Sequence, residues 1–439
     1  MEKMNACLRA VPCLVDLDPI ICLFTPSGFV MAAPTLDIAF VRSQFPAFSE
    51  PSLQGQAFFE NAGGSFACLP VIERLSAYYR RLKVQPYYAY SASTEAGEWM
   101  DSAYRRMAEY LGVGPDEVHF GPSTSQNTYV LAQAMRKQLR PGDEIIVTNQ
   151  DHEANSGVWR RLATDGVLLR EWCVNPDSGT LALADLDVLL TSRTRLLAFT
   201  HCSNIIAHIN PVAEITARAR AVGAISVVDG VSYAPHGFPD VPTLGADIYL
   251  FSLYKTFGPH QGLMVMRPEL VDRLGNEGHE FNGSHLRKRL VPAGPDHAQI
   301  AASAGIADYF DALDAHHGGG DVAHRPQRLR ELLHVAEQPL LKRVLDELGA
   351  HPRLRLLGPV DVARRTGTVA IVPSRRSPAG VAARLASAGV MAASGNFYAV
   401  RLLEALGIES ASGVLRLSLA HYTTADEVEQ LLTALDDAL

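Results

Sequence analysis

The chain has 439 residues, enough to bury a large core and to form two domains. Hydrophobic residues make up 47% of it and charged residues 20%, as is usual for a soluble globular protein. The net charge of -8 lacks the basic excess that nucleic acid or an anionic membrane would attract, so neither is expected as a partner.

The first thirty residues differ from the rest of the sequence. The stretch 11–30 is fairly apolar, but its aspartates and prolines argue against a membrane span. A signal peptide is a weak match, because Glu2 lies near the amino terminus and the apolar stretch is broken. We expect residues 1–30 to be an extension upstream of a start at Met31, with an ordered extension as the alternative. Six cysteines without metal-ligand spacing indicate reduced thiols and a cytoplasmic protein.

From residue 38 onward, helical and strand patterns alternate. Helices are predicted over residues 70–81, 102–111, 128–138, 157–164, 183–190 and 212–222. Strands are predicted over residues 118–120, 144–148, 168–172, 195–200 and 225–229, and a further strand is predicted to begin at residue 248. This alternation predicts an α/β fold with a mostly parallel sheet and helices on both faces. Such sheets bind ligands beyond the carboxyl ends of their strands.

The character of the sequence changes after residue 266. Helices are predicted over residues 299–313, 327–348, 379–388 and 425–435, and strands over residues 369–373 and 414–419. This part reads as a smaller α+β domain. The expected organisation is an extension at 1–30, a large domain at 31–300 and a small carboxyl-terminal domain at 301–439.

Two strand ends carry an acid and a lysine. The strand 225–229 ends in Asp229, and the apolar run that begins at residue 248 ends in Lys255, inside a polar turn bounded by glycine. Pyridoxal phosphate (PLP) chemistry needs this pair, because a lysine forms the Schiff base and an acid keeps the pyridine nitrogen protonated. A helix-capping aspartate and a surface lysine are the ordinary explanations of each residue alone. Their combination in this order favours a PLP site.

Other strand ends carry groups that suit the rest of this cofactor. The segment 121–127 follows a strand and opens a helix, where N–H groups and hydroxyls suit a phosphate. Plain helix capping is the alternative for this segment. His152 follows the strand 144–148 and is placed to cover the ring, although a structural histidine is the alternative. Asn204 follows the next strand and is suited to bond the ring hydroxyl.

Together these motifs resemble the class V aminotransferase family, specifically its cysteine desulfurase-like branch. The segment 151–155 resembles that branch's Glu-His-His-Ala-Asn motif, and the segment 415–422 resembles its late Arg-x-Ser-x-x-x-Tyr strand. The resemblance covers roughly residues 40–439. It implies the PLP-dependent transferase fold of the aspartate aminotransferase type, PLP as cofactor, and a homodimer.

The resemblance also implies a role for each matched residue. Lys255, His152 and Asp229 are the expected catalytic residues, and Arg416 is expected to bind the substrate carboxylate. Asn61 and Tyr398 are expected to line the substrate pocket. The expected cofactor contacts are Thr124, Ser125, His152, Asn204, Asp229, Ser232, Ser252, Tyr254 and Lys255.

The sequence departs from the family where desulfurases carry a nucleophilic cysteine. The segment 394–399 matches that loop, and Tyr398 stands at the position of the cysteine. No cysteine follows Cys202, so persulfide transfer through a thiolate of the small domain is excluded unless the thiol comes from elsewhere. The family's cross-subunit phosphate threonine is also missing, with Asp296 or His297 as possible replacements.

The sequence therefore predicts a PLP-dependent enzyme that acts on a small amino-acid substrate, with Lys255 removing the Cα proton. The first expectation is a C–S lyase that performs β-elimination on a cysteine-type substrate, because the nearest branch handles sulfur amino acids. An aminotransferase or epimerase is the alternative, and a PLP-binding protein without turnover is the third.

Overall fold

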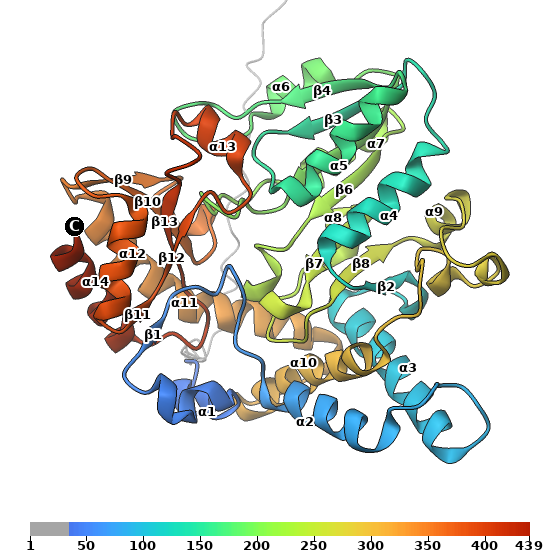
Figure 1. Ribbon diagram of the computed structural model, residues 1–439, viewed down its shortest axis with the longest axis horizontal. Coiled ribbons are helices and arrows are strands. Elements are labelled where there is room, and N and C mark those ends of the chain that lie inside the picture. Colours follow the sequence, from blue (N-terminus) through green and yellow to red (C-terminus); the bar gives the residue numbers. More distant parts are fainter. Residues whose placement is uncertain (1–34) are drawn as a thin grey trace, which may run out of the picture. The chain divides into compact units, whose positions relative to one another are not determined.

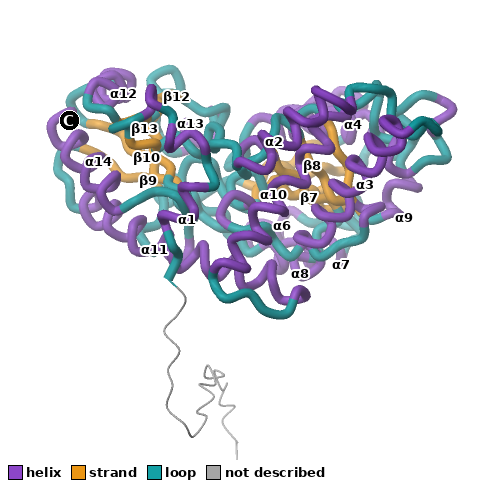
Figure 2. The backbone as a smooth tube through the Cα atoms, turned by 90° about the horizontal axis from the view of Figure 1, so that it is seen from below, coloured by secondary structure: helices purple, strands orange, loops and turns teal. Residues whose placement is uncertain are grey.

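The computed structural model describes residues 35–439, so the predicted start at Met31 and the extension 1–30 lie outside the described residues. Within this part, the strands form a seven-stranded sheet, a four-stranded sheet and a two-stranded sheet. The two larger sheets form separate groups of strands flanked by helices (Figure 1, Figure 2). The fold class is therefore α/β, as predicted.

The seven-stranded sheet is mostly parallel. Its strands are arranged in the order β2-β8-β7-β6-β5-β3-β4, and β8 runs antiparallel to both of its neighbours. The bounds are β2 (Val118–Gly121), β3 (Glu144–Thr148), β4 (Leu168–Trp172), β5 (Thr194–Thr200), β6 (Ile225–Asp229), β7 (Ile248–Ser252) and β8 (Gly262–Met266). The parallel run from β4 to β7 brings the carboxyl ends of β3, β5, β6 and β7 to one edge.

The central strands of this sheet are buried on both faces. Leu197 and Phe199 belong to one hydrophobic core, whereas their neighbours Leu196 and Ala198 belong to another on the opposite face. Burial on both faces is typical of parallel sheets covered by helices, and it explains the continuous apolar runs of the sequence.

Helices cover both sheets (Figure 1). Those before residue 300 are α1 (Ile38–Ser43), α2 (Leu69–Ala77), α3 (Ser91–Leu111), α4 (Thr124–Arg136), α5 (Gly157–Arg160), α6 (Leu183–Leu189), α7 (Val212–Ala221), α8 (Val241–Leu244), α9 (Pro268–Arg273) and α10 (His297–His316). Those that follow are α11 (Arg325–Gly349), α12 (Pro378–Ser387), α13 (Val400–Ala405) and α14 (Ala425–Ala438). Helix α10 packs against α2 and α3. None of the helices between residues 35 and 439 has the length and apolar character that a bilayer crossing requires.

The four-stranded sheet is antiparallel and has its own core. Its order is β12-β13-β10-β9, with bounds β9 (Leu354–Leu357), β10 (Thr368–Pro373), β12 (Ala393–Gly395) and β13 (Val414–Ser418). Helices α11, α12 and α14 supply apolar side chains to the same core. The domain boundaries at residues 30 and 300 stay predictions.

An amino-terminal segment joins this smaller core. Strand β1 (Ala57–Phe58) pairs in parallel with β11 (Val390–Met391), and Glu60 forms a parallel bridge with Ser418 at the end of β13. The N–H of Ser418 donates to the carbonyl of Phe59 over 2.7 Å. These contacts place residues 59–61 beside the strand that carries Arg416.

Candidate active site

Asp229 and Lys255 lie at the carboxyl edge of the large sheet and line one cavity. Asp229 is the last residue of β6, and Lys255 ends the short 3-10 turn Leu253–Lys255 that follows β7. The two strands are parallel neighbours, so their ends meet as the sequence predicted. The cavity is lined by Ser123, Thr124, Ser125, His152, Ala154, Thr200, Cys202, Asn204, Asp229, Val231, Ser232, Ser252, Tyr254 and Lys255.

The carboxyl group of Asp229 is buried and tied down on one side. Its Oδ1 accepts a hydrogen bond of 2.9 Å from the N–H of Val231. Burial raises the pKa of Asp229 to about 6, although the Val231 N–H and the charge of Lys255 act in the opposite direction. A carboxylate that is buried in this way is stabilised most by a cationic N–H group placed next to it.

The amino group of Lys255 is prepared for nucleophilic attack. Burial, followed by the positive charge of Arg416, lowers the pKa of Lys255 to about 8, while Asp229 and Glu60 oppose the change. A larger share of the amine is therefore neutral near pH 7 than in a solvated lysine. The Nζ atom lies 5.7 Å from the centre of the Tyr254 ring.

The amino terminus of α4 opens onto the same cavity. Ser123 caps the helix by accepting from the N–H of Gln126 at 3.2 Å, and Thr124 Oγ1 lies 2.7 Å from Ser252 Oγ. A Cβ atom on Gly262 would lie 2.3 Å from the Ser123 backbone, so only glycine lets β8 begin this close to the helix. Free N–H groups and hydroxyls at this end suit an anion such as phosphate.

His152 is held at the end of β3 by the turn that follows it. Asp151 accepts hydrogen bonds from Thr148 and, at 2.8 Å, from the side chain of Asn155. The Nδ1 atom of His152 accepts from the N–H of Ala154 at 3.0 Å, which places the proton of the neutral ring on Nε2. Burial, with Lys255, lowers the pKa of His152 to about 3, so the imidazole is neutral.

Asn204 has an unused acceptor in the site. Its Nδ2 donates to the carbonyl of Phe397 at 2.9 Å, whereas its Oδ1 is buried and has no hydrogen-bond partner. Buried polar atoms normally have partners, so this atom indicates a missing ligand group.

The lining residues suit the parts of PLP in their chemistry. A helix amino terminus with hydroxyls suits the phosphate, a buried acid suits the ring nitrogen, and a neutral histidine suits the ring face. The unpaired Oδ1 of Asn204 suits the ring hydroxyl, and Lys255 suits the aldehyde carbon. Ser232 and Tyr254 complete the lining. The residues present therefore fit this cofactor.

Arg416, Asn61 and Tyr398 are not part of this lining, although Arg416 and Tyr398 each contact a residue of it. Arg416, on β13, points an Nη1 donor at the backbone oxygen of Asn204 over 3.4 Å. Its Nη2 forms an ion pair of 2.7 Å with Glu60, a residue that the sequence analysis did not single out. Glu60 directly precedes the predicted pocket residue Asn61, and 356 residues separate it from Arg416 in the chain.

Asn61 is occupied by structural hydrogen bonds. Its Nδ2 donates to the carbonyl of Ser418 at 2.7 Å, and its Oδ1 accepts from the hydroxyl of Tyr422. The side chain therefore ties the segment after β1 to the end of β13. Its expected role in substrate binding stays a prediction.

Tyr398 stands at the mouth of the site. Its side chain is 69% exposed, and its ring centre lies 5.2 Å from that of His152. Both Phe397 and Tyr398 have positive φ angles, 47° and 58°, which non-glycine residues seldom adopt. The Tyr398 carbonyl accepts from the N–H of Glu153 at 2.8 Å, which links this loop to the His152 turn.

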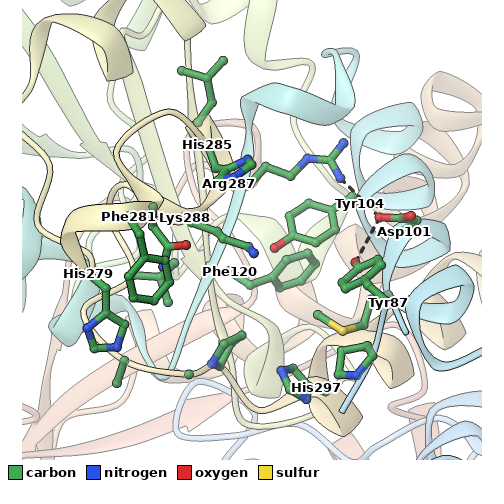
Figure 3. Close-up of a pocket in the computed structure, with 18 of the residues that line it drawn as sticks. Tyr87, Asp101, Tyr104, Phe120, His279, Phe281, His285, Arg287, Lys288 and His297 are labelled. Carbon is green, nitrogen blue, oxygen red and sulfur yellow. Dashed lines mark hydrogen bonds and ion pairs between the residues drawn. The ribbon is translucent and has the colours of Figure 1, made fainter. Parts of the chain in front are cut away.

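A larger cavity of about 840 Å³ lies elsewhere, between α3 and the segment 279–297 (Figure 3). Within its lining, Arg287 lies 3.4 Å from Asp101, and Tyr87 donates to the same carboxylate at 3.2 Å. Asp296, at its edge, caps α10 by accepting from the N–H of Gln299. The lining of this cavity includes neither Lys255 nor Asp229, so we place the chemistry in the smaller one.

Comparison with known proteins agrees with this geometry. The family model described as aminotransferase class-V matches residues 57–289 and 330–431. Aminotransferase-like protein FGM3 of Gibberella zeae is 35% identical over 423 residues, which cover 93% of this chain and 100% of that protein. A cysteine desulfurase of Serratia proteamaculans is 31% identical over 409 residues, which cover 90% of this chain and 96% of that protein.

Solved structures show the same fold. The apo structure of a cysteine desulfurase from Thermococcus onnurineus superposes with a TM-score of 0.80 at 25% identity, covering 93% of this chain and 99% of the other. The cysteine desulfurase CsdA of Escherichia coli gives a TM-score of 0.77 at 23% identity, covering 92% and 98%. The chain belongs to the class V aminotransferase family of PLP-dependent enzymes, as its strand-end motifs indicate.

Proposed function

We propose that this protein binds PLP through Lys255 and catalyses β-elimination from a cysteine-type amino acid. The observation that carries the proposal is the buried pair Asp229 and Lys255 in one cavity, with the pKa of the acid raised and that of the lysine lowered. Perturbed groups of complementary chemistry are typical of an active site.

Each residue of the site has a separate task in this proposal. Thr124, Ser125 and the first N–H groups of α4 hold the phosphate, and Asp229 holds the ring nitrogen. His152 covers the ring face, and Asn204 and Ser232 bond the ring hydroxyl. When bound, PLP supplies an electron sink for the electron pair left at Cα after a proton is removed.

The protein's own groups direct the proton and the substrate. Arg416 orients the substrate carboxylate, so that the Cα–H bond faces Lys255. The neutral amine of Lys255 removes this proton, and the Cβ–S bond breaks as the thiolate leaves and takes up a proton. Hydrolysis of the remaining fragment gives pyruvate and ammonia, so the products balance the substrate plus one water.

Elimination is favoured over persulfide transfer by the loop 394–399. Desulfurases among the relatives supply the link to sulfur amino acids, while Tyr398 stands here at the position of the family's nucleophilic cysteine. β-Elimination needs a base at Cα but no thiolate on this loop. Lys255 provides that base.

Transamination or epimerisation at the same Cα carbon is the second candidate. The relative from Gibberella zeae is named an aminotransferase-like protein, and these reactions begin with the same proton removal by Lys255. A PLP-binding protein without turnover is the weakest alternative, because the acid, the lysine and the arginine are all present. The proposal includes a cytoplasmic homodimer, and light scattering of the purified protein tests the dimer.

An absorbance titration tests the proposed function. The purified protein is expected to show a visible absorption band from PLP bound to a lysine, and Lys255→Ala is expected to lack it. Adding S-substituted cysteines should release a thiol, pyruvate and ammonia. A keto acid with a pyridoxamine-like spectrum would instead establish the transaminase, and the absence of any band after PLP addition would exclude the whole assignment.

A further inference from the structure

Arg416 already has a negatively charged partner in this protein. Its Nη2 lies 2.7 Å from Glu60 Oε1, and its side chain is only 4% exposed. Phe397 covers the guanidinium, with its ring centre 3.8 Å from Cζ, and the buried Nε has no partner. The bidentate edge that a substrate carboxylate would need is therefore partly occupied and partly covered.

The fold holds Glu60 in this position from two sides. Its backbone bridges Ser418, and its carbonyl accepts from the N–H groups of Gly63 and Gly64 at 3.0 and 3.4 Å. A Cβ atom on Gly63 would lie 1.9 Å from Glu60 Oε2, so the missing side chain at position 63 makes room for the carboxylate. The contact with Arg416 is thus built into the turn after β1.

A free α-carboxylate would meet two obstacles here. It would compete with Glu60 for Nη2, and it would place a second negative charge beside an existing one. A carboxyl group masked as an amide carries no charge, can accept from Arg416 through its carbonyl, and can donate an N–H to Glu60. The net charge beside Arg416 therefore differs between a substrate with a free carboxylate and a substrate whose carboxyl group is masked as an amide.

The geometry points to Glu60 as a specificity-determining residue: it competes with a substrate carboxylate for Arg416 and biases the site toward amino compounds whose carboxyl group is masked as an amide or ester. This inference rests on the proposed role of Arg416 in binding the carboxyl end of the substrate.

Calorimetric titration of the PLP-loaded protein tests it with two ligands that lack an amino group. We would use 3-(methylthio)propionate and 3-(methylthio)propanamide, because neither can react with Lys255 or with the cofactor. Binding is then a direct measure of carboxyl-end recognition, independent of turnover. In the unchanged protein, the amide is expected to bind at least as tightly as the carboxylate.

Glu60→Gln removes the competing charge and keeps the shape of the side chain. The dissociation constant of the carboxylate is expected to fall about tenfold, while that of the amide changes less than about threefold. Gly63→Ala is expected to act in the same direction, because it displaces the Glu60 carboxylate without removing its charge. Glu50→Gln, at an exposed acid on the same amino-terminal segment, is the matched control and should change neither constant.

The outcomes separate this inference from the proposed function. If both Glu60→Gln and Gly63→Ala bind the carboxylate no more tightly than the unchanged protein, Glu60 does not compete with a substrate carboxylate for Arg416. An equal gain in affinity for the carboxylate and the amide would contradict the competition as well. Adding Arg416→Gln to Glu60→Gln should cancel the gain. If the carboxylate still binds tightly in that double variant, Arg416 is not the carboxyl site, and that part of the proposed function fails as well.

Discussion

The two halves of the site differ in how they are built. Asp229, His152 and Lys255 follow parallel strands of the large sheet, and they keep the residue types that the family uses for its cofactor. The substrate side is made from the ion pair of Arg416 with Glu60 and from the loop with Phe397 and Tyr398, and the sequence of this loop lacks the cysteine that the desulfurase motif carries there. Strand ends fix the cofactor chemistry, and the surrounding loops decide which reaction follows.

The largest expected effect tests the cofactor half of the site. Asp229→Asn removes the negative charge that keeps the ring nitrogen protonated, and kcat is expected to fall about 10²–10³-fold at saturating PLP. Steady-state kinetics measure this loss. Asp177→Asn, at an exposed acid that does not line the cavity, is the control. Activity within threefold of the parent would show that the acid is not used.

In the protein without PLP, the buried carboxylate of Asp229 should lower the free energy of unfolding. Because the folded pKa of Asp229, about 6, lies above the ordinary aspartate value of 3.8, the stability that the protonated carboxyl group contributes is lost as pH rises through this interval. At pH 7 the apo Asp229→Asn variant is expected to be more stable by on the order of 2–3 kcal/mol. Urea unfolding at pH 4.5 and pH 7 measures the difference, which should shrink at the lower pH. A variant less stable than the parent at pH 7 would contradict the burial argument.

A smaller effect is expected at the phosphate end. Thr124→Val removes a hydroxyl that bonds Ser252 and faces the proposed phosphate, so the dissociation constant of PLP should rise about tenfold. Absorbance titration of the apo protein with PLP measures it. Thr433→Val, at an exposed position of α14, should leave the constant unchanged. An unchanged dissociation constant of PLP in Thr124→Val would show that the phosphate does not bind at the amino terminus of α4.

The smallest effect concerns the substrate side. Tyr398→Asn puts a residue that tolerates positive φ at a position with φ of 58°, and little packing is lost because the ring is 69% exposed. We expect a gain of about 0.5–1 kcal/mol in the free energy of unfolding. Thermal unfolding measures the gain. A loss of stability would instead show that the ring contact with His152 outweighs the backbone strain.

The sequence predicted the large sheet well because its strands are continuous apolar runs. The predicted strands 144–148, 168–172 and 225–229 match β3, β4 and β6 residue for residue, and β7 begins at residue 248, where the predicted apolar run begins. Helix α3 begins at Ser91 and not at residue 102, because its first turns are rich in small and polar residues that hide the apolar period. Likewise α4 begins at Thr124, within the polar segment assigned to phosphate binding.

The substrate side was harder to predict because it depends on contacts between distant segments. The neighbouring sequence does not predict a role for Glu60, because that role depends on the bridge to Ser418 and on the ion pair with Arg416. Strand β1 has two residues and β12 has three, lengths at which no alternation can be recognised. Pairings of this kind become visible only once the chain has folded.

The buried thiol of Cys202 has a consequence for tolerance to oxidants. Its side chain is 1% exposed, and burial raises its pKa to about 12, so it stays a protonated thiol beside the cavity. An enzyme that depends on an exposed thiolate is inactivated when peroxide converts that thiolate to a sulfenic acid. The proposed reaction of this protein uses the amine of Lys255 instead of a thiolate. Its turnover should therefore persist at peroxide concentrations that inactivate thiolate-dependent desulfurases.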